Sequence, residues 1–286
     1  MYLPHWVKTH LKEIKKMQKF FKNRAINTVC ETLRCPNRGN CYKETVATFM
    51  ILGNICTRDC LFCNAKKGMP FHVDKSEPER IALAVKELKL KYAVITSPTR
   101  DDLFDGGAKH FFETVREIKK HNSNTLVEVL VPDFKGRHDS IKIVTESGIN
   151  VFAHNIETVR RLHGSVRKAE YLRSLNVLAF AKKTNSDIFV KSGFMLGLGE
   201  TKNEIKETLK DLRESGCDIV TIGQYLQPSK KAIPVVEYIK PEVFEEIGQM
   251  AVLMGFKAVL SGPLIRSSTK AYETYSAVKE GRYGKL

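Results

Sequence analysis

Short apolar runs alternate with amphipathic segments along most of this chain, from about residue 45 onward. Six runs have the length and continuous apolar character of buried strands: 45–52, 91–96, 126–131, 150–154, 188–191 and 218–223. Each is followed by a segment whose apolar residues recur at helical spacing, over 78–90, 107–120, 139–146, 170–183, 204–214 and 241–254. The pattern predicts six β/α units in succession.

Near-continuous apolar strands that alternate with helices indicate a parallel sheet covered by helices, an α/β fold. Because six units fall short of a closed (β/α)₈ barrel, we predict a partial (β/α)₆ barrel of the TIM type, with an open doubly wound sheet as the alternative. Neither end of the chain fits a unit. We therefore expect an N-terminal extension over 1–44, the barrel over 45–255 and a C-terminal extension over 256–286.

Composition places the chain among ordinary globular proteins, since 42% of its 286 residues are hydrophobic and 28% are charged. It has no apolar run near the roughly 18 residues of a membrane span and no signal or transit peptide, so we expect a cytoplasmic protein without membrane contact. The formal net charge of +15 favours an acidic partner or a solvated basic surface. We expect no nucleic-acid partner, because no motif interleaves aromatic and basic residues.

Cysteine carries the chemistry, because six of the seven cysteines fall between residues 30 and 63. In a cytosolic chain such clustering favours metal binding over disulfides. Cys56, Cys60 and Cys63 follow the first predicted strand and so lie where barrel enzymes build active sites. Three thiolates can hold three corners of a [4Fe–4S] cluster and leave one iron open to a substrate. A zinc site completed by His72 is the alternative.

A first cysteine group, with the spacing C-x₄-C-x₅-C, precedes the barrel: Cys30, Cys35 and Cys41. It also lacks an obvious fourth ligand nearby. We interpret it as a second cluster, with a small zinc site as the alternative. Cys217 begins an apolar run, and we expect an inert, buried thiol there, although it is the obvious rival as a fourth ligand.

The C-x₃-C-x-aromatic-C pattern, with Phe62 as the aromatic residue, resembles the radical S-adenosylmethionine (SAM) enzymes. That resemblance implies that the open iron is chelated by the amino and carboxylate groups of SAM. It also implies that one electron from the cluster cleaves SAM into methionine and a 5′-deoxyadenosyl radical.

The first cysteine group upstream of the second is similar to the lipoyl synthases, and this resemblance extends over nearly the whole chain. The segments that carry it follow in family order: Pro4–Trp6, Cys35–Asn37, Arg100–Leu103, Asp105–Ala108, His154–Thr158, Lys191–Glu200, Gly223–Pro228, Pro234–Tyr238 and Pro263–Ser268. The chain departs from the family in Thr269-Lys270-Ala271, where Tyr-His-Ala is usual. Alternatives are a biotin-synthase-like enzyme that acts on a small free substrate, and a zinc or iron–sulfur binding protein without turnover.

The resemblance implies insertion of two sulfur atoms at C6 and C8 of an octanoyl group that is amide-linked to a lysine. The auxiliary cluster at the first cysteine group would be the sulfur donor, and one SAM would serve each C–H bond. Expected partners are an octanoylated H protein, an E2 lipoyl domain or an octanoyl-lysine peptide, together with an electron donor such as ferredoxin or flavodoxin. The family's carrier domains are acidic, which suits the basic charge of this chain.

The resemblance also implies residue roles. Ser268 would ligate the auxiliary cluster and Arg266 would control access to it, although residues alone favour a helix N-cap for Ser267 and Ser268. Expected contacts to SAM are Phe62, Asn155, Glu157, Lys191, Gly197, Gly199 and Glu200. Helix capping and ordinary loop geometry are the alternatives for Asn155, Glu157 and the glycines. The roles of Arg100, Asp101 and Asp102 stay open between a turn, SAM and the substrate.

Overall fold

The computed structural model describes residues 5–32, 35, 37, 41 and 47–286, and for residues 5–13 it describes the backbone alone. Pro4 and Pro36 of the family-like segments lie outside these residues. So do the boundary expected at residue 44 and the first two residues of the strand expected over 45–52. Within the described part of the chain, no helix is long and apolar enough to cross a membrane.

The apolar runs of the sequence pair into one sheet. In the described residues it has nine strands, ordered along the sheet as β1 (Asn27–Thr28), β2 (Thr48–Met50), β5 (Tyr92–Thr96), β6 (Leu126–Leu130), β7 (Val151–Ala153), β8 (Phe189–Leu196), β9 (Ile219–Gln224), β10 (Ala258–Gly262) and β11 (Gly284–Lys285). All neighbours run parallel except β1 and β2, which run antiparallel. Because β1 and β11 lie at opposite ends of the order, the sheet curves without closing, as expected for a partial barrel.

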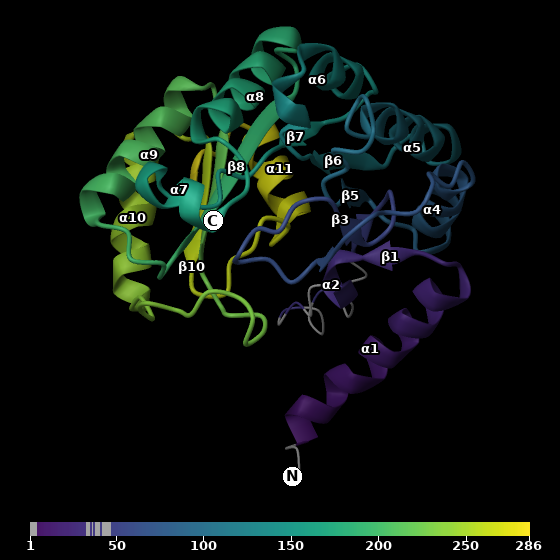
Figure 1. Ribbon diagram of the computed structural model, residues 1–286, viewed down its shortest axis with the longest axis horizontal. Helices are drawn as coiled ribbons and strands as arrows, with labels where there is room; N and C mark the ends of the chain where they lie inside the picture. Colours follow the sequence, from purple (N-terminus) through teal and green to yellow (C-terminus); the bar gives the residue numbers. More distant parts are fainter. Residues whose placement is uncertain (1–4, 33–34, 36, 38–40, 42–46) are drawn as a thin grey trace.

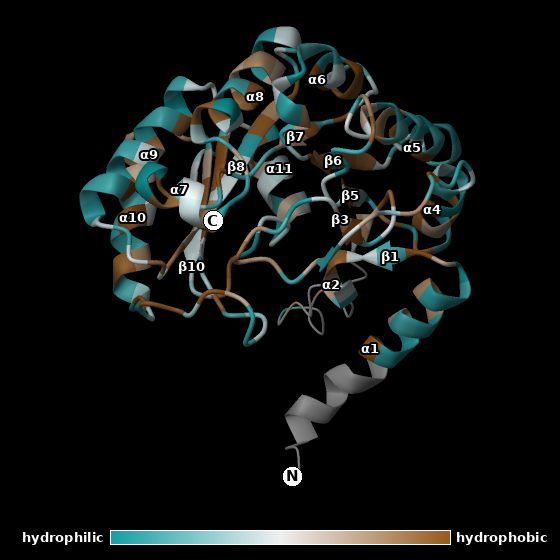
Figure 2. Ribbon diagram, in the orientation of Figure 1, coloured by the Kyte–Doolittle hydropathy of each residue, from teal (hydrophilic) through white to brown (hydrophobic). Residues whose placement is uncertain are grey.

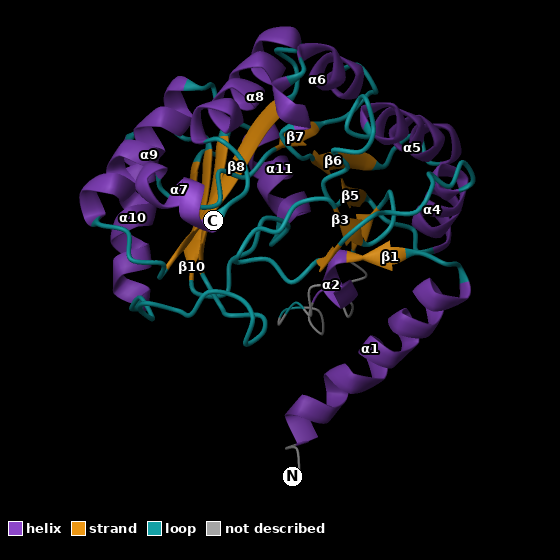
Figure 3. Cartoon of the chain, in the orientation of Figure 1, coloured by secondary structure: helices purple, strands orange, loops and turns teal. Residues whose placement is uncertain are grey.

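Most of the helices that follow the strands line the outside of the curved sheet, as Figures 1 and 3 show. The helices that follow the strands are α4 (Glu77–Glu87), α5 (Ala108–His121), α6 (His138–Thr145), α7 (Arg160–Val166), α8 (Tyr171–Thr184), α9 (Lys202–Glu214) and α10 (Pro241–Leu253). Before the barrel come α1 (His5–Asn23) and α2 (Val29–Thr32), and after it comes α11 (Ala271–Lys279). In Figure 2 the strands are mainly hydrophobic, whereas the helices turn hydrophilic residues outward, as layered α/β packing requires.

Alternating side chains of the strands meet different neighbours. On β5, Ala93 and Ile95 join the core that lies under α4 and α5. Tyr92 and Val94 point the other way and pack with Ala271 at the start of α11. The ring of Tyr275 in the same helix packs against the ring of Tyr92, with the two ring centres 6.1 Å apart. Helix α11 therefore covers the inner face of the sheet near the amino ends of the strands.

The predicted β/α units are confirmed, with boundaries that mostly shift by one to three residues. Strand β8 is longer than the expected 188–191, and α7 was not predicted. Strand β10 falls within the expected C-terminal extension and yet pairs with β9, so the parallel sheet continues past residue 255. Its five residues end in Ser-Gly, and this polar end obscured the strand in the apolar pattern.

Candidate active site

Every parallel strand ends at the same edge of the sheet, so the loops after the strands meet there. The loop after β2 carries the second cysteine group. The family-like segments from Arg100 onward lie at the carboxyl ends of β5, β7, β8, β9 and β10 or in the loops that follow them. Figure 3 shows these long loops within and below the arc of helices. Parallel topology thus brings residues that are distant in sequence to one edge.

Within the loop after β2, the strand β3 (Ile55–Cys56) pairs with β4 (Lys66–Lys67) and closes the cysteine segment into a small compact unit. Each of the three sulfurs accepts a backbone N–H. Arg58 N donates to Cys56 Sγ at 3.4 Å, Lys168 N to Cys60 Sγ at 3.3 Å, and Ala65 N to Cys63 Sγ at 3.5 Å. Such bonds are the ones that tune an iron–sulfur cluster through its sulfur ligands.

Burial raises the pKa of the Cys60 and Cys63 thiols, and the neighbouring thiols of the group raise it further. Arg167 opposes the shift at Cys60, and Lys67 opposes it at Cys63. Without iron the thiols of Cys60 and Cys63 are therefore protonated at neutral pH, and ligation must release those two protons.

The three sulfurs do not gather around one point. In the part of the chain that the structure describes, no three Cys, His, Asp or Glu side chains are arranged to hold a single metal ion. Ligands of a cube-shaped cluster bind separate irons and lie apart from one another. Three half-buried sulfurs that each accept an N–H fit three corners of one cluster.

Arg58, which the sequence did not single out, fastens this loop to the barrel. Its guanidinium donates to both oxygens of Asp101 at 2.6 and 2.9 Å and to both oxygens of Asp133 at 2.7 and 3.0 Å. It also donates to the carbonyl oxygen of Lys168 at 3.2 Å. Burial lowers the pKa of Arg58, but the two carboxylates outweigh it and raise the pKa above its usual value. Bidentate pairs of this kind hold a guanidinium in one orientation.

The neighbouring Arg100 fastens a second part of the same loop. It is buried and donates to the carbonyl oxygens of Leu52 at 3.1 Å and Phe71 at 3.0 Å. Asp102 receives Arg100 Nη2 at 2.8 Å, and this hydrogen bond lowers the pKa of Asp102. The three residues whose roles the sequence left open thus all take part in contacts to this loop: Asp101 bonds to Arg58, Arg100 bonds to two carbonyl oxygens, and Asp102 bonds to Arg100.

A polar cavity of about 130 Å³ opens beside the cysteine loop. It is lined by Thr96, Ser97, Thr99, Leu130, Val131, Pro132, Asn155, Glu157 and Arg167. Two expected SAM contacts therefore line one cavity, Asn155 and Glu157, and the Asn155 amide donates to Glu157 Oε1 at 3.1 Å. Burial raises the pKa of Glu157, while Arg167 and Asn155 oppose that shift. Neither residue caps a helix, because the N-cap of α7 is Val159.

Arg167 is a further cavity residue that the sequence did not reveal. Its guanidinium donates to the carbonyl oxygen of Asn155 at 2.5 Å and lies 3.3 Å from His154 Nε2. Burial, and to a lesser extent the positive charge of Arg167, lowers the pKa of His154 to about 3, so this imidazole is neutral. With Nε2 facing the guanidinium as an acceptor, Nδ1 donates to the Val131 carbonyl at 2.8 Å. In the sequence Arg167 is a single arginine in a loop, and this feature is too common to predict a cavity residue.

The Arg-Ser-Ser segment lies against the first cysteine group. Asn37, two residues after Cys35, donates to the carbonyl oxygen of Leu264 at 2.7 Å. Burial lowers the pKa of Arg266, and an electrostatic interaction with Cys35 opposes that shift. The guanidinium and the Cys35 thiol are therefore neighbours. Cys35 is half-buried and donates its backbone N–H to the Cys30 carbonyl at 3.1 Å.

The two serines of that segment are held from two directions. Asn155 Nδ2 donates to Ser267 Oγ at 2.8 Å, and Thr48 Oγ1 donates to Ser268 Oγ at 3.0 Å. The interpretation of these serines as a helix N-cap is wrong, because Lys270, in the left-handed region at φ 48°, is the N-cap of α11. A tight turn just before the helix directs the serines toward the barrel instead.

Other expected residues have neighbours of their own. Lys191 is buried and donates to Glu128 at 2.9 Å, and Tyr92 donates to the same carboxylate at 2.8 Å. Glu200 accepts the backbone N–H groups of Gly197 and Leu198, the latter at 2.9 Å. These interactions order the glycine turn from within.

Phe62 is partly buried and packs against the cluster of Val166, Leu198 and Tyr225. Cys217 is fully buried, as expected, and burial raises the pKa of its thiol to about 12. Gly199 has a positive φ of 95° and faces Val236, in the segment before α10.

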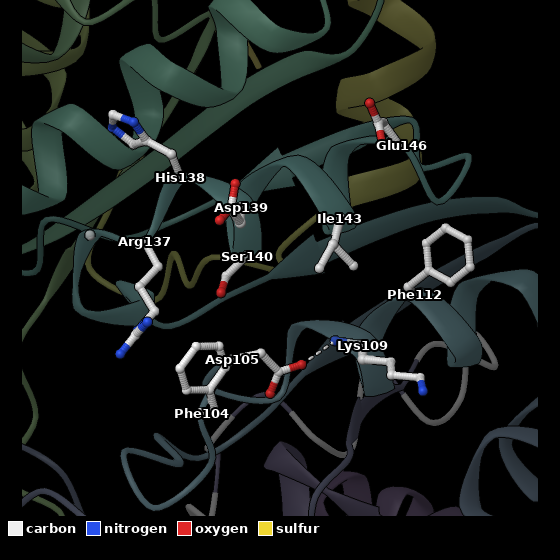
Figure 4. Close-up of a pocket in the computed structure, with 11 residues that line it drawn as sticks. Phe104, Asp105, Lys109, Phe112, Arg137, His138, Asp139, Ser140, Ile143 and Glu146 are labelled. Atoms are coloured by element: carbon white, nitrogen blue, oxygen red, sulfur yellow. Dashed lines mark hydrogen bonds between the residues drawn. The ribbon is translucent and has the colours of Figure 1, made fainter.

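A larger cavity of about 690 Å³ lies away from the cysteines, between α5 and α6 on the outer wall. Figure 4 shows Phe104 and Arg137 at one end of it and Glu146 at the other. The Arg137 guanidinium lies 4.5 Å above the ring of Phe104. No expected site residue lines this cavity.

Comparison with known proteins agrees with the geometry. A family model of the radical SAM superfamily matches residues 50–223. A lipoyl synthase of Caldicellulosiruptor saccharolyticus is 53% identical over 275 residues, which cover 95% of this chain and 96% of that protein. A lipoyl synthase of Aquifex aeolicus is 47% identical over 266 residues, which cover 93% of this chain and 96% of that protein.

Solved structures match the fold at much lower identity. Methylornithine synthase (PylB) superposes with a TM-score of 0.56 at 14% identity, over 82% of this chain and 69% of that one. HydG, a maturase of the [FeFe]-hydrogenase, superposes with a TM-score of 0.58 at 14% identity, over 82% of this chain and 54% of that one. These two likenesses support the partial barrel and carry no argument about substrate.

Proposed function

The chain belongs to the lipoyl synthase family of the radical SAM superfamily, and on this premise we propose how its residues divide the reaction. It is a radical sulfurtransferase that uses a [4Fe–4S] cluster and SAM, and its substrate is an octanoylated protein. Carbons 6 and 8 of an octanoyl chain have no acidic hydrogen, so acid–base chemistry cannot functionalise them. Hydrogen abstraction by a radical is required, and a cofactor has to supply it.

We propose that Cys56, Cys60 and Cys63 hold the cluster that acts on SAM. When bound, this cluster and SAM supply the radical. The protein's part is to hold the three sulfurs, through the backbone N–H groups described above, and to keep the loop in one conformation through Arg58. The donor set of three thiols leaves one iron for a ligand that is not protein.

The cavity beside that loop is proposed as the inner part of the SAM site. Glu157 is half-buried and desolvation raises its pKa, so a cationic group at this position stabilises its charged form. SAM carries an ammonium and a sulfonium, and both meet that requirement. Arg167 is already bonded to Asn155 and lies beside Glu157, so we assign it to shaping the cavity and balancing its charge. Lys191, Gly197, Gly199, Glu200 and Phe62 remain predicted contacts.

We further propose that Cys30, Cys35, Cys41 and Ser268 hold the auxiliary cluster that donates sulfur, with Arg266 beside it. The observation that carries this proposal is the contact between the two segments. Asn37 bonds to the Leu264 carbonyl at 2.7 Å, and Arg266 neighbours Cys35, although more than 220 residues separate them. An oxygen ligand suits a cluster that must be dismantled, because iron in such clusters prefers thiolate.

The finer partners are proposals as well. An H protein, an E2 lipoyl domain or an octanoyl-lysine peptide would present the octanoyl group, and ferredoxin or flavodoxin would supply electrons. The net charge of +15 supports electrostatic docking of an acidic carrier. The cytoplasmic location stays a prediction.

An anaerobic single-turnover assay with an octanoyl-lysine peptide tests the division of labour. The wild type should release 5′-deoxyadenosine and convert the peptide to its lipoyl form. A Cys56/Cys60/Cys63→Ala variant should do neither. A Cys30/Cys35/Cys41→Ala variant should still cleave SAM while adding no sulfur. Sulfur insertion by this last variant would contradict the assignment of the donor cluster.

A further inference from the structure

Thr48 is placed between the barrel and both parts of the proposed auxiliary site. It is the first residue of β2, and its side chain is 7% exposed. Its hydroxyl donates to Ser268 Oγ at 3.0 Å across 220 residues of sequence. A single hydrogen bond from a buried strand residue to a turn residue so far along the chain fixes the turn relative to the sheet.

The register of the first two strands places Thr48 near Cys30 as well. Thr28 pairs with Phe49 in the antiparallel β1–β2 ladder, so Thr48 faces the point where β1 passes into α2. Helix α2 begins at Val29 and carries the buried Cys30. By this register Thr48 lies opposite Val29, the residue before the first cysteine of the group, and it is bonded to the serine.

A serine oxygen needs such a neighbour to hold one position. The Ser side chain rotates about one bond and has three staggered orientations of similar energy. A hydroxyl that donates to Ser268 Oγ selects one of them and still leaves a lone pair of the oxygen open.

We propose that Thr48 is a positioning residue for Ser268, one that keeps the serine oxygen oriented as a ligand of the auxiliary cluster. The inference rests on the proposed ligand role of Ser268. Thr48 itself binds no iron. It acts by holding the oxygen in place before ligation and by donating to that oxygen afterwards.

The test uses a Cys56/Cys60/Cys63→Ala background, in which iron can reside only at the first cysteine group, and follows iron release to a chelator after anaerobic reconstitution. Thr48→Val removes the hydroxyl with little change in shape and should speed iron release about tenfold, equivalent to about 1.4 kcal/mol. Thr48→Ser keeps a hydroxyl and should release iron at nearly the rate of the background. Thr48→Ala should behave like Thr48→Val and replaces it where valine prevents folding.

Two controls separate positioning from general destabilisation. Thr125→Val removes another buried hydroxyl, which donates to the Leu90 carbonyl at 2.8 Å at the amino end of β6, and should leave iron release unchanged. Ser268→Ala should speed release, and adding Thr48→Val to it should change nothing further, because the two residues act through one oxygen.

The outcomes distinguish the inference from its premise. Faster release in Ser268→Ala with no change in Thr48→Val and Thr48→Ala overturns the role of Thr48 alone. Additive effects of Thr48→Val and Ser268→Ala overturn it too, since the threonine would then act elsewhere. Unchanged release in Ser268→Ala overturns both this inference and the proposed serine ligand.

Discussion

Replacing Arg58 by methionine removes the side chain that ties the cysteine loop to the barrel. The change breaks four N–H···O contacts of 2.6 to 3.0 Å to two carboxylates. One of these carboxylates, Asp133, has no exposed side-chain surface, so its charge loses its main partner without gaining water. Removing one member of a buried ion pair costs about 3–5 kcal/mol. Because Arg173 still lies 3.4 Å from Asp133, we expect about 3 kcal/mol for Arg58→Met.

Chemical denaturation of the apo chain measures this loss, and pH provides an internal check. In the wild type, burial raises the pKa of Asp133, but Arg58 outweighs it and holds that pKa below its usual value. A lowered pKa contributes stability above about pH 4, and this contribution fades as the pH falls below that. Arg58→Met should therefore lose more stability at pH 7 than at pH 3. Asp133→Asn should recover part of the loss, because no buried charge remains.

The cluster should respond as well. Without Arg58 the Lys168 carbonyl loses a donor, and the Lys168 N–H that bonds to Cys60 Sγ becomes less constrained. The reduction potential of the reconstituted cluster should shift in Arg58→Met and return toward the wild-type value in Arg58→Lys. Destabilisation below about 1 kcal/mol at pH 7, the size of a surface ion pair, would show that Arg58 does not stabilise a buried Asp133 charge.

Other expectations follow from separate parts of the fold. Lys191→Met removes the cation from the buried Glu128 and leaves it only the Tyr92 hydroxyl, so the free energy of unfolding should fall by about 3–5 kcal/mol. The double variant Lys191→Met/Glu128→Gln should lose less, and equal losses would contradict an ion-pair role. Gly197 has a φ of 101°, and an added Cβ would lie 2.3 Å from Gln224 Nε2, so Gly197→Ala should lower the free energy of unfolding by about 1–3 kcal/mol. Gly148→Ala is the control, because Gly148 has a φ of 94° and open space around it, so that this change measures the backbone strain alone. Affinity for an acidic octanoylated carrier should fall steeply between low and physiological salt, and salt-insensitive binding would argue against electrostatic docking.

Local patterns in the sequence were sufficient for the barrel. Helical and strand periodicities depend on neighbouring residues, so the β/α units could be predicted before any contact was known. Spacing also identified both cysteine groups, because metal ligands cluster in sequence. Strand β10 escaped prediction because its five residues include a polar Ser-Gly end, and only its pairing with β9 reveals it.

Long-range pairs could not be predicted in this way. Arg58 and Asp133 lie 75 residues apart, and Thr48 and Ser268 lie 220 apart; both contacts depend on strand register and on how loops cross the barrel edge. Lys191 shows that the direction of a side chain is also hard to predict from the sequence. The family-like segment predicts a SAM contact and this stays a prediction, but nothing in the sequence indicates that the same side chain bonds to Glu128 on a neighbouring part of the sheet. A polar residue near a strand end can point into the cavity or into the barrel, and the sequence alone does not decide between them.

Iron and sulfide counts after anaerobic reconstitution test the two-cluster account most directly. We predict about eight irons per chain for the wild type and about four for either the Cys56/Cys60/Cys63→Ala or the Cys30/Cys35/Cys41→Ala variant, since a [4Fe–4S] cluster holds four. Cys217→Ala should keep all eight. About four irons in the wild type, unaffected by loss of Cys30, Cys35 and Cys41, would contradict a sulfur-donating cluster at the first cysteine group.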